Sequence, residues 1–140
     1  VDDIGIHSIK DAVGDFEFSK KQLELLKDKV DIYSGNDNQT YDFVINGGVG
    51  VVSVASHVVG DEISEMISFA KDNDLEKAEE INMQLSNLFE AIFEEPSPGP
   101  IKKILSESWE EVGEPLLPIT SITPELANKI RGFYKKIKEN

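Results

Sequence analysis

The chain has 140 residues, of which 39% are hydrophobic and 29% are charged, and this composition is typical of a single globular domain. A formal net charge of −13 argues against nucleic acid or an anionic membrane as a partner. The absence of cysteine excludes disulfides, thiol catalysis and cysteine-bound zinc. No apolar run approaches the roughly 20 residues of a membrane helix and no signal-peptide pattern begins the sequence, so we expect a cytoplasmic protein.

The first sixty residues alternate between strand and helix patterns. In chain order they predict a strand over 4–9, a helix over 15–29, a strand over 30–33, a helix over 39–46 and a strand over 49–54. Asp15 is the expected cap of the first helix, and Gly47-Gly48 is the expected stop of the second. Strict alternation of this kind is typical of an α/β fold with a parallel sheet and right-handed crossovers.

Helices follow to the end of the chain. The patterns predict helices over 59–71, 74–93 and 101–108, and a last helix that starts at Thr123-Pro124 with Thr123 as its cap. Asn73 with Glu76 resembles a capping box at the start of the second of these helices. We therefore expect two parts of one domain, with three strand–helix units over 1–60 and helices over 61–140.

Lys10 is the first candidate for chemistry, because it stands at the carboxyl end of the first predicted strand. That rim carries the active sites of (β/α) barrels. An amine held among apolar neighbours loses its proton more easily and can attack a carbonyl to form a Schiff base. An ordinary surface lysine just past a strand is the alternative, and spacing alone favours that alternative.

Other candidate motifs have simple structural interpretations. Ser34-Gly35-Asn36-Asp37 follows the second strand, and either a ligand-binding turn or a plain strand–helix turn accounts for it. Gly47-Gly48-Val49-Gly50 precedes a strand, which excludes a phosphate loop and favours a tight structural turn.

We expect the two histidines to lie in different parts of the fold. His7 lies on the strand face opposite Lys10 and should be buried against the helices, whereas His57 follows the third strand near the functional rim. Two distant histidines without clustered carboxylates make a poor metal site, so we expect no metal.

Three strands cannot close a barrel. Their outer edges would lack partners, and an open edge beside an apolar strand favours association with another chain. The sequence also begins with Val1 and enters a strand almost at once, so it resembles a piece of a longer protein. We therefore expect either a partner chain or further strands in the natural context.

Four segments together resemble a known family in order and spacing. They are Ile9-Lys10-Asp11-Ala12 with Gly14-Asp15, Tyr33-Ser34-Gly35-Asn36-Asp37, the run from Gly47 to Val54, and the run from Pro96 to Lys102. The chain resembles the C-terminal half of the dihydrodipicolinate synthase/N-acetylneuraminate lyase family of class I aldolase-type enzymes. The resemblance covers nearly all 140 residues.

The resemblance implies a (β/α)8 barrel with extra C-terminal helices, of which this chain holds strands six to eight. Lys10 matches the family's Schiff-base lysine, and Gly35 and Val52 match positions that line the pyruvate pocket. Dihydrodipicolinate synthases are the most similar branch. They condense pyruvate with aspartate semialdehyde in lysine biosynthesis, usually as homotetramers, and the mechanism needs neither a metal nor an organic cofactor.

The sequence also departs from the family pattern. Ser8 stands where glycine is usual, Ser97-Pro98-Gly99-Pro100 replaces Asn-Pro-Ile-Pro, and Gly113-Glu114-Pro115 replaces Arg-Leu-Pro. A 2-keto-3-deoxy sugar acid aldolase or an N-acetylneuraminate lyase therefore stays an alternative.

The resemblance further implies that the family's carboxylate-binding loop, proton-relay tyrosine and substrate-binding arginine lie upstream of this chain. We expect the isolated chain to be inactive or weak. An inactive half-barrel that assembles through its strand edges is the non-enzymatic alternative, and a split enzyme is a third.

Overall fold

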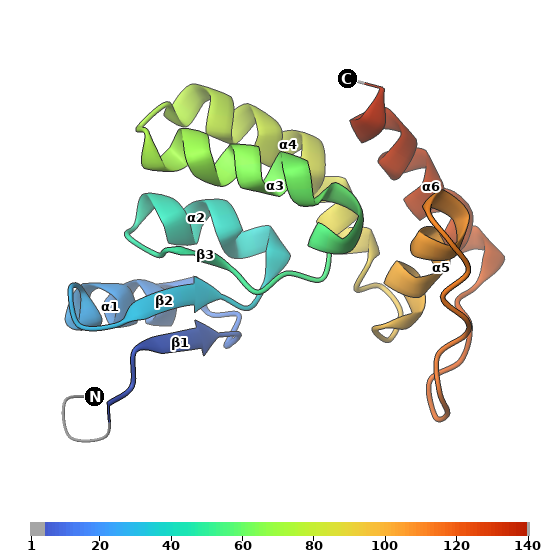
Figure 1. Ribbon diagram of the computed structural model, residues 1–140, viewed down its shortest axis with the longest axis horizontal. Helices are drawn as coiled ribbons and strands as arrows, with labels where there is room; N and C mark the ends of the chain where they lie inside the picture. The colour runs from blue at the N-terminus through green and yellow to red at the C-terminus, as the bar shows by residue number, and fades with distance from the viewer. Residues whose placement is uncertain (1–4, 140) are drawn as a thin grey trace.

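A three-stranded parallel sheet organises the amino-terminal part of the chain in the computed structural model, which describes residues 5–139 (Figure 1). The strands β1 (Ser8–Asp11), β2 (Asp31–Ser34) and β3 (Gly50–Val51) lie side by side in that order. Their register aligns Lys10 with Tyr33 and Tyr33 with Gly50. The predicted α/β class and parallel sheet are confirmed.

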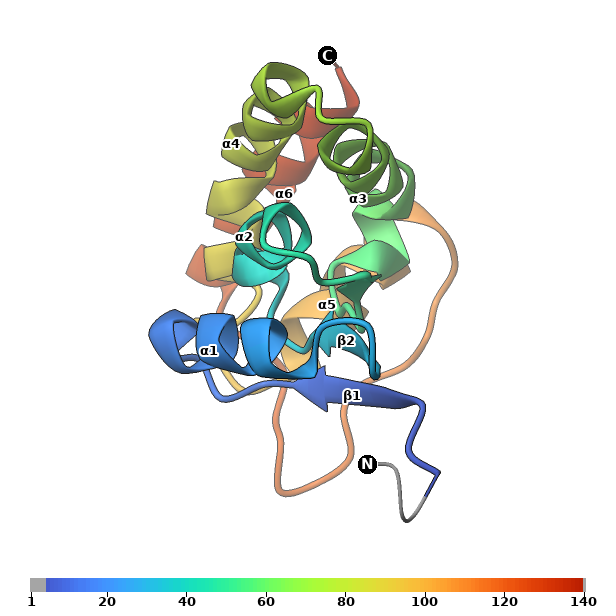
Figure 2. The same ribbon diagram turned by 90° about the vertical axis from the view of Figure 1, so that its left-hand side faces the viewer.

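Short helices connect the strands and cover one face of this sheet. They are α1 (Phe16–Leu26), the 3₁₀ helix η1 (Asp37–Gln39) and α2 (Thr40–Ile45), and Figure 2 shows α1 and α2 on the same side of the strands. Ile32 of β2 packs against Leu23 of α1 and Phe43 of α2 in a small apolar cluster. Because paired residues in parallel strands share a face, Lys10 and Tyr33 lie on the opposite face, away from these helices.

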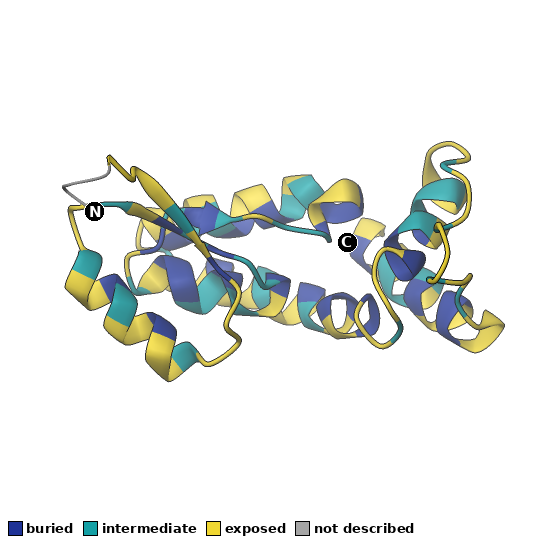
Figure 3. Cartoon of the chain, turned by 90° about the horizontal axis from the view of Figure 1, so that it is seen from below, coloured by how far each residue is buried: buried dark blue, intermediate teal, exposed yellow. Residues whose placement is uncertain are grey.

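Four later helices build the larger core. They are α3 (Ser56–Lys71), α4 (Leu75–Ala91), α5 (Gly99–Ser108) and α6 (Pro124–Lys138). Their buried sides form one apolar cluster, and the facing sides of the helices are dark blue in Figure 3. Met66, Leu85, Leu88 and Ile92 are among its fully enclosed members. No helix within residues 5–139 is long and apolar enough to cross a membrane.

Local hydrogen bonds explain where two helices begin. The Asp15 carboxylate accepts the backbone N–H groups of Glu17 and Phe18 at 3.1 and 3.2 Å, as predicted for a cap. Thr123 accepts the N–H of Leu126, with Pro124 in the first turn of α6. These two predicted starts are confirmed.

The predicted capping box at Asn73 is wrong. Asp74 caps α4 instead, with its carboxylate accepting the N–H of Lys77 at 3.5 Å. Asn73 has a φ of 62° and belongs to the turn after α3, since asparagine tolerates this left-handed conformation better than most residues.

Several predicted boundaries differ from the observed ones. β1 begins at Ser8 instead of residue 4, so Lys10 lies within the strand, and Ile4 is outside the described residues. The third strand, predicted over 49–54, is only Gly50–Val51, because within residues 5–139 it pairs with β2 alone. α1 ends at Leu26 instead of residue 29, before Asp28 with its φ of 63°.

The later helices also differ at their ends. α3 begins at residue 56 instead of 59, with a kink at Val59, α4 ends at residue 91 instead of 93, and α5 begins at residue 99 instead of 101.

His7 is exposed, which contradicts the prediction that it would be buried against the helices. Its backbone carbonyl accepts the N–H of Asp31 at 3.0 Å just before β1 begins. The alternation of faces holds within a strand, and His7 precedes the strand, so the rule does not place it.

An ion pair between Glu107 of α5 and Arg131 of α6 makes the stability of the fold depend on pH. Arg131 donates to both carboxylate oxygens of Glu107 at 2.8 and 2.7 Å, and these bonds together with Lys103 lower the pKa of Glu107 from 4.5 to about 2. Because Glu107 is more acidic in the folded chain, the pair stabilises the fold above the unfolded pKa. That contribution is lost as the pH falls through about 2.

We expect Arg131→Gln to lower the urea midpoint at pH 7, and the difference from the wild type to shrink as the pH falls from 4.5 toward 2. Lys135→Gln, which removes an exposed lysine from the same helix, is the matched control. A difference between wild type and Arg131→Gln that does not change with pH would contradict the assignment.

Candidate active site

Lys10 is the residue before the last one of β1, and its side chain packs against Gly35 after β2. A Cβ atom at position 35 would lie 2.8 Å from Lys10 Cε, 2.5 Å from Ala12 Cβ and 2.9 Å from the carbonyl oxygen of Asp11. These separations are far below van der Waals contact, so only glycine fits beside the lysine in this arrangement.

The turn that contains Gly35 is fixed by its own hydrogen bonds. Gly35 N–H donates to the Asp11 carbonyl at 2.6 Å, and the Ser34 hydroxyl donates to the Asn36 carbonyl at 2.8 Å. Gln39 receives a bond from the Asn36 side chain and donates to the Gly14 carbonyl at 3.0 Å. The turns that follow β1 and β2 are therefore connected to each other.

Val52 joins the same edge from the third strand. Its N–H donates to the Ser34 carbonyl at 2.8 Å, and its side chain is 49% exposed. Lys10, Gly35 and Val52 therefore lie at the carboxyl ends of three adjacent strands, as the order of elements predicts.

Asp37 is a buried member of the turn after β2, and the sequence pattern predicts no separate role for it. It is 1% exposed, and its carboxylate accepts the Ser53 hydroxyl and the N–H groups of Val54 and Ala55 at 3.1 and 3.2 Å. The carboxylate thus connects the turn after β2 to the segment between β3 and α3. The available sequence signal was an acidic residue upstream of the segment Ser-Val-Ala-Ser, where a helix begins. Because 16 residues separate Asp37 from Ser53, no local pattern predicts this contact.

The histidines lie far apart along the sheet. His57 is exposed in the first turn of α3, on the side where β3 ends, and His7 precedes β1 at the other end. Within residues 5–139 no group of three or more histidine and carboxylate side chains is placed to hold a metal ion.

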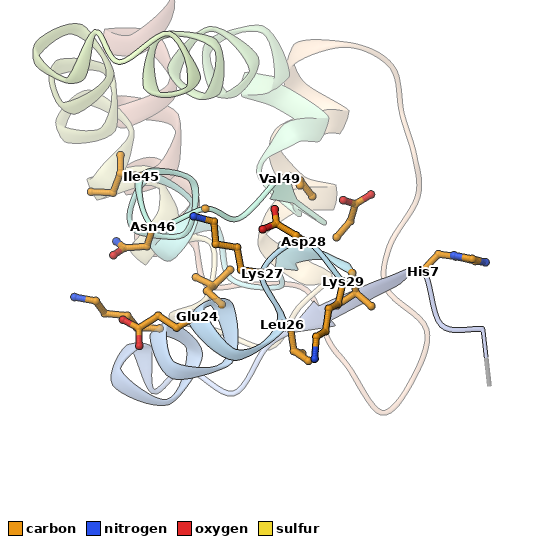
Figure 4. Close-up of a pocket in the computed structure, with 14 residues that line it drawn as sticks. His7, Glu24, Leu26, Lys27, Asp28, Lys29, Ile45, Asn46 and Val49 are labelled. Atoms are coloured by element: carbon orange, nitrogen blue, oxygen red, sulfur yellow. The ribbon is translucent and has the colours of Figure 1, made fainter. Parts of the chain in front are cut away.

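An open hollow of about 800 Å³ lies at the opposite end of the strands from Lys10. Figure 4 shows it between the ends of α1 and α2, with His7, Lys27, Asp28, Lys29 and Asn46 around it. It contains neither Gly35 nor Val52, so it is separate from the candidate site.

The glycine-rich segment before β3 is a tight turn, as predicted. Gly47 has a φ of 99°, which favours glycine, and a Cβ at Gly48 would lie 2.9 Å from the Phe43 carbonyl oxygen. Gly48 N–H donates to that same oxygen at 2.7 Å. The segment brings the chain from α2 directly into β3.

Comparison with known proteins assigns the family. Residues 4–137 match the model of the Dihydrodipicolinate synthetase family. The chain belongs to this family. The 4-hydroxy-tetrahydrodipicolinate synthases of Microcystis aeruginosa and Thermosynechococcus vestitus are 43% and 40% identical to it, over 94% and 90% of this chain and 44% and 43% of theirs.

Solved structures agree with this assignment. A dihydrodipicolinate synthase from Cyanidioschyzon merolae, solved with lysine bound, has a TM-score of 0.89 and 34% identity over 95% of this chain and 45% of its own. One from Bacillus anthracis has a TM-score of 0.86 and 34% identity over 93% and 44%. The chain therefore spans a little under half the length of the relatives it matches.

The close approach at Gly35 predicts a specific substitution effect. Gly35→Ala places its Cβ against the Asp11 backbone and Lys10, so we expect a loss of about 1–3 kcal/mol in the free energy of unfolding. Urea denaturation measures it.

Gly132→Ala is the matched control, since a Cβ at this helical position meets nothing within 4 Å. We expect it to be neutral or stabilising by up to about 1 kcal/mol. Equal effects of the two alanines would contradict the packing described at Gly35.

Proposed function

We propose that the chain supplies the Schiff-base lysine of a lyase that condenses pyruvate with aspartate semialdehyde, the reaction of dihydrodipicolinate synthases. One observation carries the proposal: in a member of this family, Lys10 lies on the sheet face turned away from the helices and packs against the glycine of the Ser-Gly-Asn-Asp turn. The carboxyl edge of parallel strands is where (β/α) barrels carry their active sites.

The proposed chemistry starts at the Lys10 amine. In its neutral form, Nζ attacks the keto carbon of pyruvate, and the carbonyl oxygen leaves as water after proton transfer, which gives an iminium ion. The iminium accepts the electron pair released when a methyl proton is removed, so an enamine forms. The enamine carbon then bonds to the aldehyde carbon of the second substrate, whose oxygen takes up a proton, and the iminium forms again. The amine of the aspartate semialdehyde portion adds to the iminium carbon and displaces Nζ, which frees Lys10 and closes the product ring.

Gly35 and Val52 serve as pocket walls in this proposal. The Gly35 N–H already donates to Asp11, so the residue contributes space beside Lys10 rather than a hydrogen bond to the substrate. The exposed Val52 side chain offers an apolar surface for the pyruvate methyl group. Arg131 is the single arginine of the sequence and is paired with Glu107, so an arginine that binds the substrate carboxylate would come from the rest of the barrel.

We further propose that β1, β2 and β3 are strands six to eight of a (β/α)8 barrel, and that the other strands complete the site. Within residues 5–139 no strand pairs with the outer edge of β1 or β3. Several large apolar side chains on this part of the chain are exposed, namely Val13, Phe18, Leu25 and Val52. A complementary barrel segment would cover them and supply the proton-transfer groups, whose contribution is typically about 10²–10⁴-fold in rate.

Two alternatives stay open. A 2-keto-3-deoxy sugar acid aldolase or N-acetylneuraminate lyase would use the same Lys10 chemistry with another aldehyde. An inactive half-barrel would instead associate through its open strand edges, and light scattering that shows a stable dimer without carbonyl reactivity would favour it.

Lys10→Ala provides the direct test of the nucleophile. Borohydride should trap pyruvate on the wild-type chain as a stable mass increase, and Lys10→Ala should show none, because the reacting amine is absent. Lys20→Ala, which removes an exposed lysine of α1, should keep the adduct. An adduct that persists in Lys10→Ala would exclude the assignment.

Complementation tests the need for the rest of the barrel. We expect the isolated chain to turn over pyruvate and aspartate semialdehyde at least about 10²-fold more slowly than a complete synthase. Adding the part of the Microcystis aeruginosa synthase that this chain does not match should restore activity. Full turnover by the isolated chain would contradict the proposal that the site is incomplete.

A further inference from the structure

We infer that Asp37 is a positioning residue that fixes the place of the pocket wall around Val52 relative to Lys10, which lies across β2 from it. The inference rests on the proposed function, because Val52 lines a pyruvate pocket only if that function holds. The Asp37 carboxylate is buried and takes no part in the proposed chemistry.

The Asp37 carboxylate is enclosed and has three donors. Both oxygens are used: one accepts the Ser53 hydroxyl, and the other accepts the backbone N–H groups of Val54 and Ala55 at 3.1 and 3.2 Å. With 1% exposure it cannot reach a substrate directly. Buried carboxylates are costly unless fully hydrogen-bonded, so these bonds specify one conformation for the segment after β3.

The bonds continue on both sides of this carboxylate. The Ser53 oxygen also accepts the N–H of Ser56 at 2.7 Å, which extends the network to the first residue of α3. On the other side, Val52 N–H donates to the Ser34 carbonyl at 2.8 Å. Residues 52–55 are therefore hydrogen-bonded to the end of β2 at Ser34 and to Asp37 in the turn that follows it.

The same turn carries the glycine that contacts Lys10. Gly35 lies two residues before Asp37, and a side chain there would overlap Lys10 Cε. Asp37 thus joins the two wall positions, Gly35 and Val52, in one hydrogen-bonded unit. Without it, the Val52 N–H bond to the Ser34 carbonyl would be the one hydrogen bond left, within residues 5–139, between residues 52–55 and residues 34–37, so the wall could move relative to the lysine.

The experiment measures two quantities on the 140-residue chain and its variants. Hydrogen exchange reports how well the Val54 and Ala55 amides are protected. Trapping with cyanoborohydride over a range of pyruvate concentrations reports the half-saturating concentration for the adduct on Lys10.

We expect Asp37→Ala to speed exchange of both amides and to raise the half-saturating pyruvate concentration, each about tenfold, with the adduct still forming at saturation. Asp37→Asn keeps one carbonyl acceptor for the backbone donors and should recover most of both losses. Ser53→Ala removes one donor of three and should have an intermediate effect. Asp61→Asn removes an exposed charge from α3 and is the matched control.

The outcomes separate the two proposals. No adduct on the wild-type chain contradicts the proposed function and the inference that rests on it. A wild-type adduct whose half-saturating pyruvate concentration is unchanged in Asp37→Ala overturns the positioning role alone, even if that variant unfolds at a lower temperature. If Asp37→Ala does not fold, Ser53→Ala and Asp37→Asn decide the matter, and half-saturating concentrations equal to the wild type in both would overturn the role.

Discussion

The candidate site depends on the common register of the three parallel strands. The pairing of Lys10 with Tyr33 and of Tyr33 with Gly50 brings the carboxyl ends of all three strands to one edge. A shift of β1 by one residue would turn Lys10 toward the helices, because neighbouring side chains of a strand point to opposite faces. The contact between Lys10 and Gly35 exists only in this register.

The helical part of the chain stabilises this edge through the start of α3. The carboxylate of Asp37 binds the backbone just before that helix, and α3 then packs against α4 and α5 within the larger apolar cluster. The short turns after β2 and β3 are thereby connected to buried residues such as Met66 and Leu88. A small three-stranded sheet has few core residues of its own, so this connection gives the site edge a rigid support.

Much of this arrangement could be predicted from the sequence, because it follows from the order of the elements. Alternating strand and helix patterns indicate a parallel sheet, and that sheet places Lys10 and the Ser-Gly-Asn-Asp turn at one edge. The strand limits could not be predicted, since they depend on which neighbours pair. His7 is the clearest example, because it lies just before β1. Asp37 was missed because its partners at Ser53, Val54 and Ala55 lie 16–18 residues away, beyond any local pattern.

The chain spans a little under half the length of its relatives, and we propose that its Lys10, Gly35 and Val52 form one side of a pyruvate site. An experimental structure of the chain after borohydride reduction with pyruvate tests this claim most directly. We predict density continuous from Lys10 Nζ to the former keto carbon, with the three-carbon unit lying between Gly35 and Val52. An unmodified Lys10 beside a reduced adduct on another lysine would contradict it.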